Sequence, residues 1–481
     1  MKFPLGRREF LQLGVAGSAL WLFAPSMKAY GAGTPLVSPG CRGTKVRVAK
    51  LYLGIPKALW PTPTMDLNAE IERYESEFQS RPADFGDVDF AVTELVTSRE
   101  QAAQLAERLG DVDGILAVHL SMGVMEIVQE LLKSRKPTVL FASPYSGHEW
   151  TGFGALERSE AGARLSCMLT SDMGQLAAAV RPFRAIHHLR EAKILNVTAQ
   201  DPKAEFLQAV KDKFGTSIVR IDRDRVLAAY ESVAPATAEA EAERWISGAV
   251  EVVEPPRDEI VRSCRLALAF EQLLDEESGT AITVDCYGSM YRKLPAFPCI
   301  GFTRLNDMGL AGICESDLTS AMTFLLMQAM SGKPGFISDP TVDESKDAII
   351  LAHCLGSTKM NGPNGEACPY KLRTIMERQE GAVPQVYMRA GERVTQGILI
   401  GADTLRYFTG DIIEVPDTER GCRTKVTVKV DGDIGVLWRN WAHGLHRVTC
   451  YGDMTDDLRR FCRFEGIQLL DEARAADAAR A

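Results

Sequence analysis

The pattern of short apolar runs changes once along the chain, and this change constrains the fold more than any other feature. From Lys45 onward, apolar runs typical of buried strands alternate with segments that have the period of helices. Such alternation predicts parallel sheets covered by helices. After Val342 the apolar runs become short, and turns containing Gly and Asp separate them, which is typical of an antiparallel sheet or barrel. We therefore expect an α/β protein with two Rossmann-like α/β domains followed by a β-rich, barrel-like C-terminal domain.

The same pattern places the domain boundaries. A chain of 481 residues is too long for a single hydrophobic core. The first α/β domain is expected over residues 45–180 and the second over residues 181–341, where "EAKILNVTA" opens a new series of strands and helices. The β-rich domain is expected over residues 342–481.

The N-terminus resembles a twin-arginine export signal. Arg7 and Arg8 are followed by Phe-Leu, by an apolar run over residues 14–24, and by small residues. This run is far shorter than the roughly 20 residues that span a bilayer. We therefore expect a signal peptide over residues 1–32, export to the periplasm, and no stable membrane anchor. The resemblance also implies that the protein folds and takes up its cofactor before export.

Composition excludes several classes of function. The net charge of −9 and the absence of a Lys/Arg block argue against a nucleic-acid surface, so a small molecule is the expected partner. The eleven cysteines are scattered without CxxC pairs, which indicates neither a disulfide framework nor a zinc knuckle. The stretch "GFGALE" lacks the third glycine of a dinucleotide loop.

Two carboxylates flank one apolar segment in "CESDLTSAMTFLLMQAMSGKPGFISDP". Residues 318–330 predict a helix, and "GFIS" predicts a short buried strand with Asp339 at its exit. Strand exits of α/β sheets are where ligands bind, so Glu315 and Asp339 are candidate catalytic residues. An alternative stays open, in which Glu315 offsets the helix dipole and Asp339 belongs to an ordinary Asp-Pro turn.

Three of the seven histidines are candidate metal ligands. His353 ends a predicted strand, and His443 and His446 stand in "HGLH", whereas His187 and His188 are expected on a surface turn. A lone histidine at a strand end usually has a structural role. Two carboxylates and two imidazoles that converge would instead suit a six-coordinate divalent ion, and Mn²⁺ is the natural candidate.

The segments "CIGFTRLNDMGLAGICESDLTSAMTFLLMQAMSGKP", "LAHC" and "HGLHRVTCYGD" resemble the core of the L-fucose isomerase and L-arabinose isomerase superfamily. In that superfamily a Glu, a later acid and a C-terminal His hold a divalent metal, and Glu315, Asp339 and His446 match them. The arabinose isomerase branch adds a His, which His353 matches. The resemblance implies Mn²⁺, or another divalent ion such as Mg²⁺ or Co²⁺, and a homo-oligomer.

The expected reaction is aldose–ketose isomerisation of a sugar. It moves a proton between adjacent carbons through an enediol, which requires an acid/base pair and stabilisation of oxyanion charge. Glu315 and Asp339 would supply the pair and the metal would act as Lewis acid. Two alternatives remain, an exported sugar-binding protein that has lost turnover and a sugar epimerase that uses the same intermediate. We expect the substrate pocket to include His148, Lys359, Asn440 and Trp441.

Overall fold

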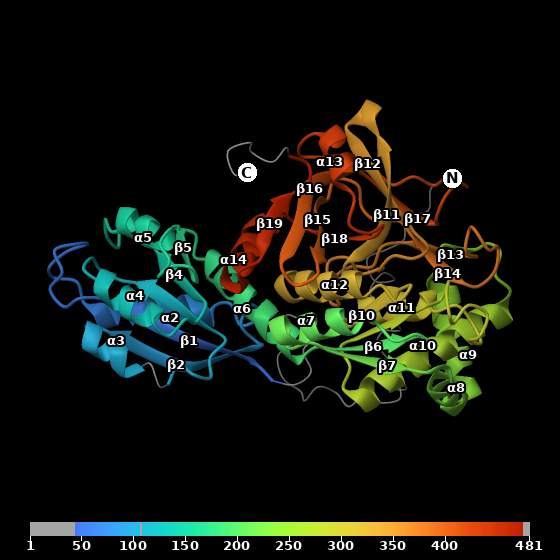
Figure 1. Ribbon diagram of the computed structural model, residues 1–481, viewed down its shortest axis with the longest axis horizontal. Coiled ribbons are helices and arrows are strands. Elements are labelled where there is room, and N and C mark those ends of the chain that lie inside the picture. Colours follow the sequence, from blue (N-terminus) through green and yellow to red (C-terminus); the bar gives the residue numbers. More distant parts are fainter. Residues whose placement is uncertain (1–43, 106–107, 475–481) are drawn as a thin grey trace, which may run out of the picture.

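The computed structural model describes residues 44–105 and 108–474, which form two α/β domains and a barrel (Figure 1). The expected signal peptide, residues 1–32, lies outside the described residues. Among the described residues, no helix has the length and apolar character needed to cross a membrane.

The N-terminal domain is a five-stranded parallel sheet with the order β2-β1-β3-β4-β5. Its elements are β1 (Val46–Leu53), α2 (Leu67–Gln79), β2 (Val88–Val96), α3 (Arg99–Leu105), β3 (Gly114–His119), α4 (Met125–Leu132), β4 (Thr138–Ala142), α5 (Trp150–Glu157) and β5 (Leu165–Leu169). Every residue of β3 and β4 is buried, because helices cover both faces of a parallel sheet.

One long helix, α6 (Gln175–Glu191), joins the first two domains and contains the expected boundary between residues 180 and 181. It packs against β1, β3 and β4 of the first sheet and against α12 and α14 further along the chain. The expectation that His187 and His188 lie on a surface turn is wrong, since both are buried in this helix. The apolar residues around them give α6 a buried face that continues to its C-terminal end.

The second domain has a four-stranded parallel sheet with the order β10-β9-β6-β7. Its elements are β6 (Lys193–Val197), α7 (Ala204–Phe214), β7 (Ser217–Ile221), α8 (Arg223–Ser232), α9 (Pro235–Gly248), β8 (Glu251–Val252), α10 (Arg257–Glu277), β9 (Ala281–Val284), α11 (Cys299–Asp307), β10 (Ala311–Cys314) and α12 (Leu318–Ser331). In both sheets the strand order reverses at the first strand, which creates a switch point where ligands commonly bind.

The C-terminal domain is a closed antiparallel barrel of six strands, β15-β18-β11-β12-β17-β16, in which β15 also pairs with β16. Its elements are β11 (Phe336–Asp343), η1 (Glu344–Lys346), β12 (Ala348–His353), β13 (Tyr370–Arg373), β14 (Val383–Val386), β15 (Arg393–Ile400), β16 (Thr404–Glu414), β17 (Thr424–Val430), α13 (Ile434–Asn440), β18 (Arg447–Tyr451), α14 (Thr455–Glu465) and β19 (Gln468–Asp471). The expected fold class is thereby confirmed.

Helix α12 connects the second sheet to the barrel. It contacts β9 and β10 on one side and β15 and β18 on the other, and Figure 1 shows it between these two layers. Its apolar side chains are buried from Ala321 to Met330. Gly332 ends the helix at a φ of 69°, a left-handed conformation that glycine adopts without a steric penalty. Helix α12 therefore connects the turn that carries Glu315 to strand β11, which carries Asp339.

Candidate metal centre and active site

Glu315 lies in a strained turn between β10 and α12. Glu315 has a φ of 63° and Ser316 a φ of 56°, and two consecutive non-glycine residues in this region are costly. Helix α12 begins at Leu318 with Asp317 as its N-cap, and its first turn contains no acidic residue. Glu315 therefore lies before the N-cap and not in the first turn, where the alternative placed it to offset the helix dipole. The turn instead exposes the Glu315 carboxylate at the carboxyl end of β10.

Asp339 is not at the exit of a strand of the second domain, as the sequence suggested. Strand β11 continues to Asp343 and belongs to the barrel, because its first half pairs with β18 and its second half with β12. Asp339 is the residue at which the partner changes. Its cross-strand neighbour is Ala352, beside His353, and Ser338 is opposite Arg447, beside His446. Three candidate ligands are thus brought together by the register of adjacent strands.

The four candidate ligands converge in the structure. His446 Nε2 lies 3.2 Å from Asp339 Oδ1 and 3.9 Å from Glu315 Oε2, and His353 Nε2 lies 4.0 Å from Glu315 Oε1. The donor atoms of Glu315, His353 and His446 all lie within 4.8 Å of one another. Asp339 is outside this group of three but contacts it through His446. Of the two histidines in "HGLH", His446 is buried, whereas His443 is exposed.

Asp317 is a member of the cluster that the sequence analysis missed. Nδ1 of His446 donates a hydrogen bond to Asp317 Oδ2 at 3.0 Å, which turns Nε2 toward Asp339 and Glu315. Asp317 is itself held by the backbone N–H and the hydroxyl of Ser320. A carboxylate that orients a ligating histidine in this way is common at metal sites. The signal in the sequence was an Asp at the N-cap position of a predicted helix.

Two atoms in this cluster test whether a cation fits. Asp339 Oδ1 and His446 Nε2 are buried and lie 3.2 Å apart as an ion pair, and neither has a hydrogen bond of good geometry among the described residues. Leaving such atoms unpaired costs free energy, so buried polar atoms without partners are rare. A divalent cation would satisfy both atoms at once. The two carboxylates and two imidazoles present are also the donor set that suits Mn²⁺.

Electrostatics in the cluster favour a positive charge. Burial alone would lower the pKa of His446, but the carboxylates of Asp317 and Asp339 outweigh it and raise that pKa to about 10. Burial and the neighbouring His446 lower the pKa of His353 to about 4. Burial also raises the pKa of Glu315. The charge of His446 lowers this pKa, and the charges of Asp339 and Asp317 raise it. In the absence of a cation, the cluster holds a proton on His446 instead.

A polar cavity of about 420 Å³ opens beside Glu315 at the carboxyl ends of β6, β9 and β10. This is the switch point of the second sheet. Its polar lining residues are Asn196, Thr198, Gln200, Asp201, Lys203, Asp285, Glu315, Ser316, Asp317 and Thr319. Hydroxyl, amide and carboxylate groups of this kind are suited to binding the hydroxyl groups of a sugar.

The four residues predicted for the substrate pocket do not line this cavity. His148 lies in the N-terminal domain, where its ring packs on Trp60 with centroids 4.0 Å apart. The other three donate hydrogen bonds to backbone oxygens: Lys359 to Pro363, Asn440 to Glu472 and Trp441 to Leu445. These three side chains therefore stabilise loops of the barrel domain.

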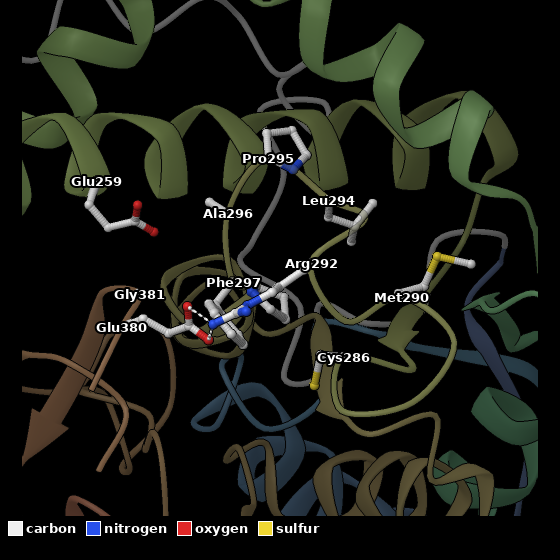
Figure 2. Close-up of a pocket in the computed structure, with 11 residues that line it drawn as sticks. Glu259, Cys286, Met290, Arg292, Leu294, Pro295, Ala296, Phe297, Glu380 and Gly381 are labelled. Atoms are coloured by element: carbon white, nitrogen blue, oxygen red, sulfur yellow. Dashed lines mark hydrogen bonds and ion pairs between the residues drawn. The ribbon is translucent and has the colours of Figure 1, made fainter. Parts of the chain in front are cut away.

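A second cavity, of about 220 Å³, lies between the second domain and the barrel loops (Figure 2). Figure 2 shows the Arg292 side chain reaching Glu380, to which it forms an ion pair at 3.1 Å. Cys286 also lines this cavity, but none of the four candidate ligands does, whereas Glu315 lines the larger one. The cavity beside Glu315 is therefore the stronger candidate for the active site.

Two parallel α/β domains, a closed barrel and a histidine–carboxylate cluster at their junction are the features expected of a sugar isomerase. No family model matches the chain. The chain is similar to a sulfoquinovose isomerase from Alkalicoccus urumqiensis, with 22% identity over 311 residues, which cover 60% of this chain and 67% of the relative. A sulfoquinovose isomerase from Clostridium sp. (strain MSTE9) is 24% identical over 225 residues, 45% of this chain and 49% of the relative. The chain thus spans about half the length of the second relative. These similarities, at low identity, support an isomerase that acts on carbohydrate.

Proposed function

We propose that the protein is a metal-dependent aldose–ketose isomerase that acts on a sugar through an enediol intermediate. The observation that carries this proposal is the buried pair of atoms without well-formed hydrogen bonds, Asp339 Oδ1 and His446 Nε2, beside Glu315 at a polar cavity. Glu315, Asp339, His353 and His446 would hold the ion, for which Mn²⁺ is the first candidate and Mg²⁺ or Co²⁺ the alternatives. When bound, the ion supplies Lewis-acid polarisation of the substrate oxygens.

The side chains have separate roles in this proposal. Glu315 lines the cavity, and the raised pKa of its carboxyl group brings it closer to that of a proton carrier at neutral pH. Asp339 is the second carboxylate of the pair, at the point where β11 leaves β18. Asp317 holds the ring of His446 in one orientation. Proton transfer by such positioned carboxylates contributes about 10² to 10⁴-fold to the rate.

The substrate is proposed to be a sugar bound in the cavity beside Glu315. Sulfoquinovose is the first compound to test, because both similar proteins carry its name. Assembly into a homo-oligomer belongs to the same proposal. It is measured by light scattering of the purified protein, and a monomer at all accessible concentrations would contradict it.

Exchange of substrate hydrogen with solvent deuterium, followed by NMR over a panel of sugars that includes sulfoquinovose, tests the reaction. We expect exchange at C1 or C2 of one sugar together with its ketose or aldose product. Glu315→Gln is expected to lower exchange by about 10²-fold or more, the scale of one general base. Glu414→Gln is the matched control, because Glu414 is an exposed carboxylate of the barrel that pairs with Lys346.

Each other outcome of this experiment contradicts part of the proposal. Sugar binding without exchange would indicate a binding protein that has lost turnover. Exchange that yields only an epimer would indicate an epimerase. Exchange that persists in Glu315→Gln would remove this residue as the essential base.

We further propose export by the twin-arginine pathway, on the basis of Arg7 and Arg8 and the short apolar run after them. Replacing both arginines by lysine is expected to retain the precursor in the cytoplasm, as measured by cell fractionation. Export at the ordinary level would contradict the assignment.

A further inference from the structure

A second group of potential metal ligands lies beside the first but shares no residue with it. It consists of Cys354, Glu377 and Cys422, whose donor atoms all lie within 4.8 Å of one another. The thiol of Cys422 donates a hydrogen bond to Glu377 Oε1 at 3.1 Å. The three residues come from distant parts of the sequence, so no short motif reveals them.

Strand register brings the two cysteines together. Cys354 directly follows β12, and Cys422 lies two residues before β17. His353, the last residue of β12, is paired with Thr424, the first residue of β17, so both thiols are at the same end of this strand pair. Glu377 reaches them from the loop between β13 and β14. The cluster therefore joins three separate segments of the barrel domain.

The surroundings of the cluster differ between its two sides. Cys354 is buried in an apolar cluster that also contains three other thiols, those of Cys286, Cys299 and Cys314. Cys422 is half-buried, and Glu377 is exposed. One side of the group is thus dry and apolar, and the other side is open to solvent. A cation can reach the cluster past Glu377 without movement of the core.

We propose that Cys354, Cys422 and Glu377 form a second metal site, which takes a thiophilic divalent cation such as Zn²⁺. Thiolates and carboxylates are both zinc ligands, and three protein ligands with a water in the fourth position complete a tetrahedral site. The oxygen and nitrogen donors of the first centre suit Mn²⁺ or Mg²⁺ instead, so the two groups select different ions. Binding releases the two thiol protons to solvent, because the thiolates are the ligands.

The ion would cross-link the barrel next to the first centre. It would tie the residue after His353 to the start of β17 and to the loop that carries Glu377. Successive residues at the end of a strand face opposite sides, which allows His353 to serve one site and Cys354 the other. This inference rests on the thiol cluster alone and does not depend on the proposed isomerase activity.

Titration of the full-length, metal-depleted protein with Co²⁺ tests the proposal under anaerobic, reducing conditions. Co²⁺ bound to thiolates gives an intense sulfur-to-metal charge-transfer absorption that oxygen and nitrogen ligands do not produce. We expect this band to saturate at about one equivalent per chain, and to be retained in His446→Ala, in which the first centre has lost a ligand. Zn²⁺ is expected to displace Co²⁺ and to remove the band.

Variants separate the site from other thiols. Cys422→Ser is expected to abolish the band, and Glu377→Gln, at an exposed position, is expected to weaken Co²⁺ binding by about 10-fold or more without removing it. Cys462→Ser is the matched control, because Cys462 is a buried thiol in α14, in a different apolar cluster. A wild-type protein without the band, or a band unchanged in Cys422→Ser, would overturn the proposal. A Cys354–Cys422 disulfide that persists in the reduced protein would also overturn it.

Discussion

Two buried histidines, His119 in the N-terminal domain and His446 at the edge of the barrel, have opposite hydrogen-bonding states. His119 ends β3 at the switch point of the first sheet, and both of its ring nitrogens are bonded, to Ser146 Oγ at 2.8 Å and to Glu149 Oε2 at 3.0 Å. His446 donates from Nδ1 to Asp317, whereas its Nε2 lies 3.2 Å from Asp339 Oδ1 without a hydrogen bond of good geometry within the described chain. Burial and a nearby carboxylate are common to both histidines. The two histidines differ in whether the second ring nitrogen has a well-formed hydrogen bond, and we propose that this difference marks His446 as a ligand.

The cavities beside these histidines are similar in size. The cavity at His119 has a volume of about 360 Å³ and the one at Glu315 about 420 Å³. Both lie at the carboxyl ends of parallel strands, where α/β proteins commonly bind ligands. Cavity volume and position in the sheet therefore do not identify the active site. The donor atoms without well-formed hydrogen bonds and the strained turn at Glu315 and Ser316 favour the cavity beside Glu315, since both features call for a compensating role.

The largest expected effect separates the two histidines directly. His446→Ala removes a proposed ligand, so we expect the loss of about one bound Mn²⁺ per chain and a fall in turnover of about 10⁴-fold. His119→Ala should lower the free energy of unfolding but leave the metal content of the folded protein unchanged. Metal analysis by mass spectrometry after gel filtration measures both. Equal metal loss in the two variants would break the comparison.

The N-terminal region and the barrel each contain a buried ion pair. Breaking each pair in turn separates an effect on stability from an effect on metal binding. Arg447 donates to the Glu472 carboxylate from Nε at 3.2 Å and from Nη2 at 3.1 Å. Arg184 donates to the Asp87 carboxylate from Nε at 2.6 Å and from Nη2 at 2.8 Å. Breaking a buried pair by removing one partner costs about 3–5 kcal/mol. We expect Glu472→Ala and Asp87→Ala to be destabilised to this extent in urea unfolding. Only Glu472→Ala should also weaken Mn²⁺ binding, because Arg447 is next to His446.

A smaller effect is expected from the carboxylates that orient the two histidines. Asp317→Asn keeps the shape of the side chain but removes the charge that fixes the His446 ring, which should lower Mn²⁺ affinity by about 10 to 100-fold. The corresponding change beside His119, Glu149→Gln, should leave that affinity unchanged. Isothermal titration calorimetry with Mn²⁺ measures the difference. An unaffected Asp317→Asn protein would show that Asp317 only caps α12.

The sequence predicted the fold class and the members of the candidate ligand cluster. It predicted less well which strands and loops surround that cluster. Strand–helix alternation and the later change to short strands are local properties, so the two parallel sheets and the barrel followed from them. The resemblance singled out Glu315, Asp339, His353 and His446, which the structure brings together. The path of β11 was predicted wrongly, because strand partners are set by distant residues such as those of β18.

Partners that are distant in the sequence also explain the residues that were missed or misplaced. Asp317 is 129 positions from His446, and the thiols of Cys354 and Cys422 meet only when the barrel closes. His148 and Lys359 were expected in the pocket, but neither lines the cavity beside Glu315. Their actual environments depend on how the domains pack, which no local pattern records.

The smallest expected effect concerns pH and the N-terminal region. Burial lowers the pKa of His188 in α6 from 6.5 to about 3; Asp87 opposes this shift, whereas Arg184 and His187 contribute to it. The unfolded chain therefore binds the proton more readily between about pH 3 and pH 6.5, so this residue destabilises the fold as the pH falls through that window. His188→Phe removes the effect.

Between about pH 7.5 and 5.5, the free energy of unfolding of the wild type should fall by about 1.4 kcal/mol relative to His188→Phe. Urea unfolding at the two pH values measures this difference. Because His188 belongs to the structural region, metal content should be the same in both proteins. A difference in unfolding free energy that does not change with pH would show that His188 is not buried as a neutral side chain.

The most direct test of the account is the position of Mn²⁺ in crystals, determined by anomalous scattering. We expect a single strong peak within coordination distance of Glu315, Asp339, His353 and His446, and its loss in crystals of His446→Ala. The same data should show no peak beside His119 and Glu149, where both imidazole nitrogens are already bonded. A peak at His119, or no peak at His446 in protein that turns over a sugar, would contradict the central claim.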